Sequence, residues 1–114
     1  MPTRKQRGYD SQRLVAGYLQ SNGFPFAEST GAGRSGTDIT GCPGIDIEVK
    51  ARRGLNLLSI IKQLDEREAG LVGVGVIRPD GMGPATVGSW PTVMTLAQQV
   101  RLLRLAGYGE SIDE

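Results

Sequence analysis

The sequence predicts a single α/β domain with a mixed sheet. A length of 114 residues suits one domain with one modest hydrophobic core. Leu, Ile, Val and Phe make up about a quarter of the chain, which is above the range typical of disordered proteins. Segments with the helical spacing of apolar residues alternate with short runs typical of strands. The expected order is α-β-β-β-α-β, followed by a weak strand region and a closing C-terminal helix.

The first half should contain one helix and three strands. Asp10 is a candidate N-cap for a helix over residues 10–22, and Gly23 suits the position just after its end. The three strands are expected over residues 24–29, 37–40 and 45–51. Pro43 followed by Gly44 fits the centre of a type II turn, so the third strand should return antiparallel to the second.

The second half should contain a helix, a buried strand and a closing helix. These elements are expected over residues 57–70, 71–77 and 96–106. Gly73 and Gly75 in the buried strand should allow a helix to pack closely against it. One or two weaker strands are expected over residues 86–94, interrupted by Pro91, and Trp90 is expected in the core or at an interface.

The charged residues suggest a basic arm over residues 1–8, a domain over residues 9–109 and an acidic tail over residues 110–114. The net charge is only +1, but positive charges gather in the arm and around the third strand. The candidate DNA-binding residues are Arg4, Lys5, Arg7, Arg34, Arg52 and Arg53. This distribution predicts a polyanion bound on one face, although a solvated N-terminus without that role remains an alternative.

The composition narrows the chemistry. The chain has no histidine, which excludes Ser-His and Cys-His catalysis and histidine-ligated zinc. A single cysteine excludes an internal disulfide and a multi-cysteine metal site. The groups that remain available for catalysis are carboxylates, lysine, hydroxyls and hard cations such as Mg²⁺. No apolar run approaches the ~18 residues of a membrane span, and the expected location is the cytoplasm.

The third strand combines carboxylates with a lysine. Because side chains alternate along a strand, Asp46, Glu48 and Lys50 should share one face, while the intervening residues face the core. Asp38 on the preceding strand should lie on the same charged side. Two carboxylates can hold Mg²⁺, and a neighbouring lysine can orient water or offset charge on a phosphate. The alternative is an ordinary hairpin with one solvated, charged face.

These residues resemble a known family. Asp38 with Glu48-Val49-Lys50, in this element order, resembles the PD-(D/E)XK nuclease superfamily and implies a restriction-endonuclease-like fold. Residues 12–24 resemble the first helix of archaeal-type Holliday junction resolvases, which phages also encode; a phage protein would act in the host cytoplasm. Ser29, six residues after Gly23, matches a functional serine of those resolvases. The resemblance covers roughly residues 7–53.

The resemblance implies a structure-selective endonuclease that cuts branched DNA with Mg²⁺, or Mn²⁺ as a substitute, and leaves 5′-phosphate and 3′-hydroxyl ends. Asp38 and Glu48 would bind the metal, Lys50 would assist the attacking water, and Ser29 would lie near the scissile phosphate. No organic cofactor and no membrane partner are expected. Gln12 stands where those resolvases typically carry a glutamate, and it or Asp10 would support the site from the first helix.

Two other functions remain open at this point. Thr37 stands where the superfamily motif has proline, and Gln12 is a weaker ligand than glutamate. The chain could instead be a restriction-like or repair nuclease that acts on linear or damaged duplex. It could also be a catalytically silent DNA-binding module on the same scaffold.

A twofold homodimer is expected, because one chain offers one carboxylate–lysine patch and a four-way junction needs two cuts. Candidate interface residues are Leu102, Leu103, Leu105 and Trp90.

Overall fold

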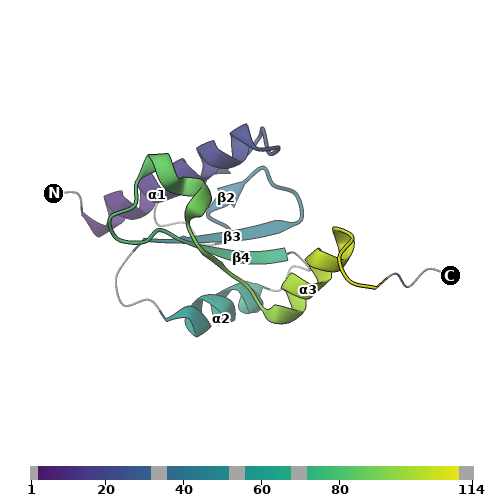
Figure 1. Ribbon diagram of the computed structural model, residues 1–114. Helices are drawn as coiled ribbons and strands as arrows, with labels where there is room; N and C mark the ends of the chain where they lie inside the picture. Colours follow the sequence, from purple (N-terminus) through teal and green to yellow (C-terminus); the bar gives the residue numbers. More distant parts are fainter. Residues whose placement is uncertain (1–2, 32–35, 52–55, 68–71, 111–114) are drawn as a thin grey trace.

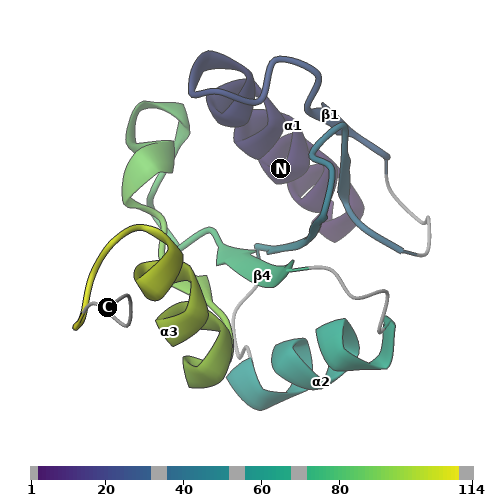
Figure 2. The ribbon, with the colours of Figure 1, turned by 90° about the vertical axis from the view of Figure 1, so that its right-hand side faces the viewer.

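The structure is a computed structural model that describes residues 3–31, 36–51, 56–67 and 72–110. It confirms a mixed α/β arrangement in layers, with the sheet between helices (Figure 1). Helix α1 (Arg4–Ser21) covers one face of the sheet, and α2 (Leu57–Arg67) and α3 (Leu96–Leu105) lie on the opposite side (Figure 2). None of the helices in the described ranges combines the length and apolarity needed to cross a bilayer.

The strands form two separate hydrogen-bonded groups. Strands β1 (Glu28–Ser29) and β2 (Ile39–Thr40) make a short antiparallel pair. Strands β3 (Ile45–Lys50), β4 (Val72–Ile77) and β5 (Thr92–Val93) form a sheet in the order β3-β4-β5. Strand β3 is parallel to β4, and β5 is antiparallel to β4. The parallel pair requires a long crossover connection, which contains α2.

Helix α1 begins earlier than the sequence analysis expected. Thr3 is its N-cap and accepts a hydrogen bond from the Gln6 backbone, while the Gln6 side chain accepts one from the Thr3 backbone. This reciprocal capping box stabilises a helix start at Arg4. The prediction that Asp10 caps the helix is therefore wrong, and residues 4–8 belong to the first turns of α1 instead of an arm that precedes it. The predicted end is confirmed, with Gly23 at a φ of 103°.

The predicted antiparallel return of the third strand does not form a ladder. The turn before β3 is present, since the Ile45 N–H donates to the Cys42 carbonyl at 3.0 Å and Gly44 has a φ of 81°. However, β2 pairs with β1, and the ladder partner of β3 is β4. Both β1 and β2 contain only two residues, which is much shorter than the predicted strands.

The core lies between α1 and the sheet. Ile47 and Val49 of β3 belong to one buried cluster with Val15 and Ala16 of α1. Trp90 joins that cluster, so it is a core residue and is not available for an interface.

Close packing of α2 against β4 is confirmed. A Cβ atom added at Gly75 would lie 2.7 Å from Ile60 Cγ2, and one added at Gly73 would lie 3.2 Å from Leu64 Cβ. Both contacts are with α2, so the two glycines let the helix approach the strand closely, as the sequence analysis expected.

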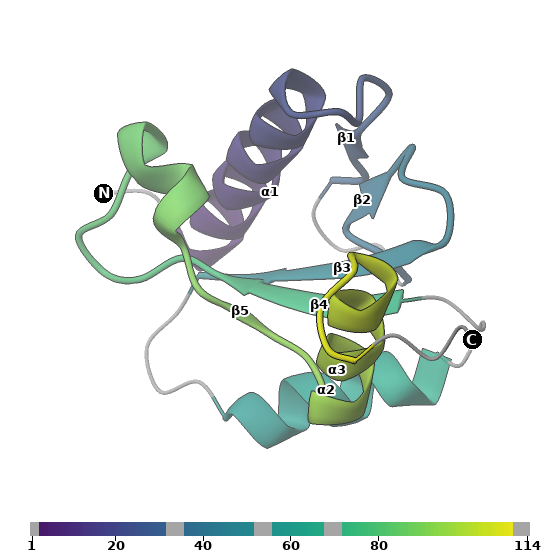
Figure 3. The same ribbon diagram turned by 45° about the vertical axis from the view of Figure 1, so that its right-hand side comes forward.

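The region before α3 differs from its prediction in part. Pro84–Ser89 form a 3₁₀ helix, η1, instead of a strand, and only the expected strand after Pro91 is present, as β5 (Figure 3). Helix α3 contains no buried residue. It is joined to the sheet through Gln98, whose side-chain amide donates to the Gly73 carbonyl and accepts from the Gly73 N–H.

Candidate active site

The edge of β3 that faces away from β4 is hydrogen-bonded to Thr37 and Asp38. The carbonyls of Gly44 and Lys50 accept hydrogen bonds from the β4 side, so the alternate groups of β3 point away from β4. On that outer edge, the Val49 N–H donates to Asp38 Oδ2 at 2.7 Å. The Asp38 carboxylate therefore lies beside β3, at the position between Glu48 and Lys50.

Glu48 and Lys50 form an ion pair on the same face of β3. The Lys50 ammonium lies 3.0 Å from Glu48 Oε2, and Lys50 retains more exposure than Glu48. Glu48 is paired with Gly75 of β4, and the Cβ position of Gly75 faces Ile60 of α2. The side chains of Glu48 and Lys50 therefore point to the face of the sheet that α2 covers in part. We call Asp38, Glu48 and Lys50 the carboxylate–lysine cluster, and it lies at the carboxyl end of β3.

The acidic residues of this region are not solvated. Only 8% of Asp38, 5% of Asp46 and 5% of Glu48 is exposed, which contradicts the alternative of an ordinary hairpin with a solvated, charged face. Burying a carboxylate costs free energy unless the carboxylate is hydrogen-bonded, paired with a cation or coordinated to a metal. Lys50 offsets this cost for Glu48. Asp46 lies on the same strand face as Glu48 and belongs to the surroundings of the cluster.

Ser29 lies on the strand next to the cluster. It is directly opposite Ile39 in the β1–β2 pair, one residue from Asp38. The next residue, Thr30, donates its N–H to the Asp38 carbonyl at 3.0 Å. The structure thus places Ser29 on the strand next to the segment that carries Asp38. The expected role of Ser29 near a phosphate stays a prediction.

Gln12 is buried and has an unsatisfied oxygen. Only 8% of the residue is exposed, and its Oε1 has no hydrogen-bond partner among the described residues. One flank of α1 faces β1, because the Gln20 side chain donates to the Ala27 carbonyl immediately before that strand. Gln12 lies eight residues before Gln20, a little over two turns of α1. Asp10 is exposed on the helix, so Gln12 is the better placed of the two candidates.

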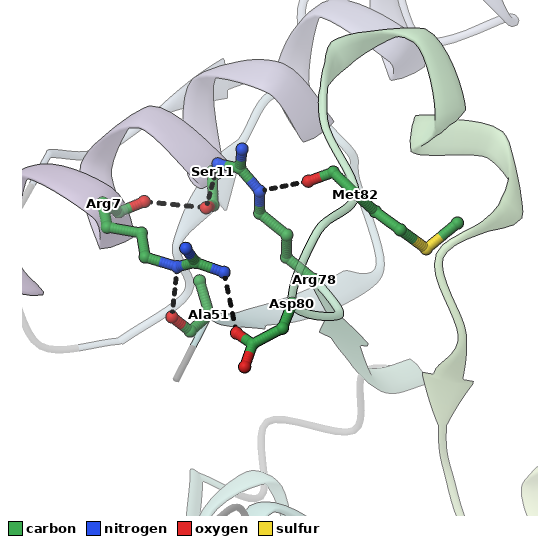
Figure 4. A network of polar contacts seen from close by, with 6 residues as sticks. All are labelled: Arg7, Ser11, Ala51, Arg78, Asp80 and Met82. Atoms are coloured by element: carbon green, nitrogen blue, oxygen red, sulfur yellow. Dashed lines mark hydrogen bonds and ion pairs between the residues drawn. The ribbon is translucent and has the colours of Figure 1, made fainter. Parts of the chain in front are cut away.

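Two arginines hold α1 against the ends of the parallel strands (Figure 4). The Arg7 side chain donates to the Ala51 carbonyl at 2.9 Å and pairs with Asp80 at 3.3 Å. The Arg78 guanidinium donates to the Ser11 hydroxyl at 3.1 Å and to the Met82 carbonyl. This network holds the carboxyl end of β3, where Lys50 lies, in place relative to α1.

The candidate DNA-binding residues are only partly described. Arg7 makes the intramolecular contacts above, and its role in DNA binding stays a prediction. Arg34, Arg52 and Arg53 lie outside the described residues. Arg4 and Lys5 are described by their helical backbone alone.

Sequence reasoning missed the residues that position the cluster. Thr37 Oγ1 accepts a hydrogen bond from the Ile47 N–H at 2.9 Å, a role that the carbonyl of a neighbouring strand usually has. The sequence signal for this contact was a threonine hydroxyl next to Asp38, since such side chains often bond to the backbone. The start of α1 also had one, since Thr3 and Gln6 have capping-box spacing. The contacts of Ser11 and Arg78 had no local signal, because these residues are 67 positions apart.

No protein-family model matches the chain, and no curated protein or solved structure is significantly similar to it. The described residues also contain no group of three or more His, Cys, Asp or Glu side chains placed to hold a metal ion.

Proposed function

We propose that the protein is a metal-dependent, structure-selective endonuclease that cuts branched DNA, specifically a Holliday junction resolvase. The observation that carries the proposal is the hydrogen bond from the Val49 N–H to the Asp38 carboxylate. It brings a buried carboxylate from one segment to the position on β3 between Glu48 and Lys50, which form their own ion pair. Phosphodiester hydrolysis can use these three groups and needs no histidine.

The order of the elements supports the same proposal. The order α1-β1-β2-β3-α2-β4 is the one expected for a restriction-endonuclease-like fold from the resemblance of Asp38, Glu48 and Lys50. These residues lie on the second and third strands of that order or immediately before them. The proposal therefore includes the fold family as well as the activity.

The donor set fits Mg²⁺. This ion prefers oxygen ligands, usually takes one or two protein carboxylates and keeps several waters. Asp38 and Glu48 would supply the carboxylates, so a third acidic ligand is not required. The buried, unsatisfied Oε1 of Gln12 is a neutral oxygen on the α1 side that could support the site. Mg²⁺ bound there would supply Lewis-acid polarisation of the phosphoryl group and a more acidic water.

The chain's own side chains would orient the substrate. The Lys50 ammonium, held by Glu48, would position the attacking water and offset negative charge that develops on the phosphate. The Ser29 hydroxyl would donate to an oxygen of the scissile phosphate. The ion pair limits the movement of Lys50, so its charge is already in place when the substrate binds.

Cleavage assays on a four-way junction and on its separate linear arms test this proposal. We expect cleavage of the junction in Mg²⁺ or Mn²⁺, none in the presence of a chelator, and little cleavage of the arms. Asp38→Asn and Glu48→Gln should abolish cleavage and leave junction binding nearly intact. Asn retains an oxygen that can accept from the Val49 N–H, so the first variant should keep the fold. Lys50→Ala should reduce turnover by roughly 10²-fold or more.

Glu66→Gln is the matched control, because Glu66 is an exposed acid on α2 and should leave turnover unchanged. Wild-type turnover by Glu48→Gln would overturn the assignment of the cluster. Equal cleavage of junction and arms would favour a restriction-like or repair nuclease. Absence of any metal-dependent cleavage, with DNA binding retained, would favour a silent DNA-binding module.

A further inference from the structure

Tyr9 and Arg13 form an exposed pair on the surface of α1. The Arg13 Cζ atom lies 5.5 Å from the centroid of the Tyr9 ring. Tyr9 is 39% exposed, and Arg13 is exposed as well. Their spacing of four residues places both on one flank of the helix.

This pair lies beside the segment that holds Asp38. A Cβ atom added at Gly31 would meet Tyr9 Cε1 at 4.0 Å. The residue before it, Thr30, donates its N–H to the Asp38 carbonyl at 3.0 Å. The Tyr9 ring is therefore separated from Asp38 by the width of one short segment of chain.

The position of α1 next to the cluster is held independently. Arg7, two residues before Tyr9, donates to the carbonyl of Ala51 at the end of β3. This contact holds the same part of α1 against the carboxyl end of β3, next to Lys50. Tyr9 and Arg13 thus lie on α1 next to the segment that carries Asp38.

Arg13 has no ion-pair partner among the residues that the structure describes. In the described part of the chain, the ion pairs are those of Arg7 with Asp80 and of Lys50 with Glu48, and none includes Arg13. An exposed cation–π contact is weak, so it leaves the guanidinium able to bind another group. The pair therefore offers an aromatic ring and an exposed guanidinium close to the segment that holds Asp38, and nucleic acid can bind to both groups.

We propose that Tyr9 and Arg13 bind a DNA strand at the branch point of the substrate and guide it to the carboxylate–lysine cluster. Arg13 contacts a backbone phosphate, and the Tyr9 ring stacks on a base that the branch leaves exposed. This inference rests on the proposed function and adds the residues that recognise the branch. Bases inside a linear duplex are already stacked, so Tyr9 contributes mainly to the affinity for branched DNA.

Fluorescence anisotropy with a labelled four-way junction and a linear duplex tests this proposal. All variants are made in the Asp38→Asn background, so that cleavage does not interfere. We expect Tyr9→Leu to weaken junction binding about 10-fold, to change duplex binding less and to leave the salt dependence unchanged. Tyr9→Phe should retain the affinity, because it keeps the ring. Arg13→Gln should make the negative slope of log affinity against log salt shallower by about 0.7–0.9, the value for one lost phosphate contact.

Tyr108→Leu and Arg101→Gln are the matched controls, since both residues are exposed in the α3 region, on the other side of the sheet. They should bind the junction like the parent. Unchanged junction affinity in Tyr9→Leu and an unchanged salt slope in Arg13→Gln would overturn this proposal and leave the proposed function intact. Equal losses on junction and duplex in Tyr9→Leu would also overturn it. If the wild-type chain neither binds nor cuts DNA, the proposed function fails, and this inference fails with it.

Discussion

Thr37 shows how much a single side chain decides in this protein. Its hydroxyl accepts from the Ile47 N–H and lies 3.2 Å from the Ile47 carbonyl, while Asp38 next to it donates its own N–H to that carbonyl. Two consecutive residues thus hydrogen-bond the backbone N–H and carbonyl of Ile47, although no strand is paired with this edge of β3. The side chain of Asp38 is held at the cluster as a result.

The first prediction at this scale concerns stability. Thr37→Val keeps the shape of the side chain but leaves the Ile47 N–H without its acceptor. We expect the free energy of unfolding to fall by about 1–3 kcal/mol, the cost of an unsatisfied donor. Chemical denaturation monitored by circular dichroism would measure the change.

Thr40→Val is the control for this measurement. Thr40 is exposed, and its hydroxyl donates to the Glu28 carbonyl at 3.3 Å. The effect of this variant should stay within about 0.5 kcal/mol. If both variants lose the same stability, Thr37 has no special role at the edge of β3.

At the scale of elements, the packing of α2 depends on the absence of side chains in β4. Gly75 faces both Ile60 on α2 and Val93 on β5, and any added methyl group would lie under 3.0 Å from each. Pro and Gly usually weaken a strand, but here the glycine allows a helix to approach. Strand β4 is therefore the point at which α2 and β5 are brought together.

We expect Gly75→Ala to reduce the free energy of unfolding by about 1–3 kcal/mol, because the added methyl group overpacks this contact. Gly83→Ala is the control, since nothing lies within 4 Å of its Cβ position and its φ of −129° suits any residue. Thermal melts of both variants would compare them. Equal melting temperatures for Gly75→Ala and the wild type would contradict the close approach of α2.

At the scale of the whole molecule, α3 presents apolar side chains to solvent. None of its residues is buried, and Leu96, Val100, Leu103 and Leu105 are among the exposed large hydrophobic residues. Trp90, the other residue expected at an interface, lies in the core. Helix α3 therefore remains as the candidate interface. A contiguous exposed apolar surface is often an interaction site.

The proposed junction cleavage leads us to expect a twofold homodimer that buries this face of α3. Sedimentation velocity at micromolar concentration, with and without a junction, should give the mass of a dimer. Leu103→Glu should shift the protein to a monomer, because it places a charge in the apolar contact.

Gln99→Glu, at an exposed polar position of the same helix, should remain dimeric. A monomer in both conditions for the wild-type chain would contradict the dimer. It would also favour a nuclease that makes a single nick over one that resolves junctions.

Much of the fold was predictable because its signals are local. Gly23 ends α1, the Pro43–Gly44 turn precedes β3, and the apolar spacing defines α2 and α3. Each depends on conformational preferences within a few residues. The helix start at Arg4 also had a local signal, in the spacing of Thr3 and Gln6.

The sequence also predicted that Asp38, Glu48 and Lys50 lie close together. Alternation along one strand placed Glu48 and Lys50 on one face, and the structure shows them as an ion pair. The expected proximity of Asp38 is also present. However, its carboxylate lies at the edge of β3 and is hydrogen-bonded to a backbone amide, which alternation alone does not predict.

Only the tertiary structure decided the pairing of β3 with β4, the burial of Asp38, Asp46 and Glu48, and the attachment of α1 through Arg7 and Arg78. These features join residues that are far apart in the chain, such as Arg78 and Ser11. Their free energy comes from hydrogen bonds and buried area that exist only once the layers have packed, whereas caps and turns depend on neighbours already in sequence.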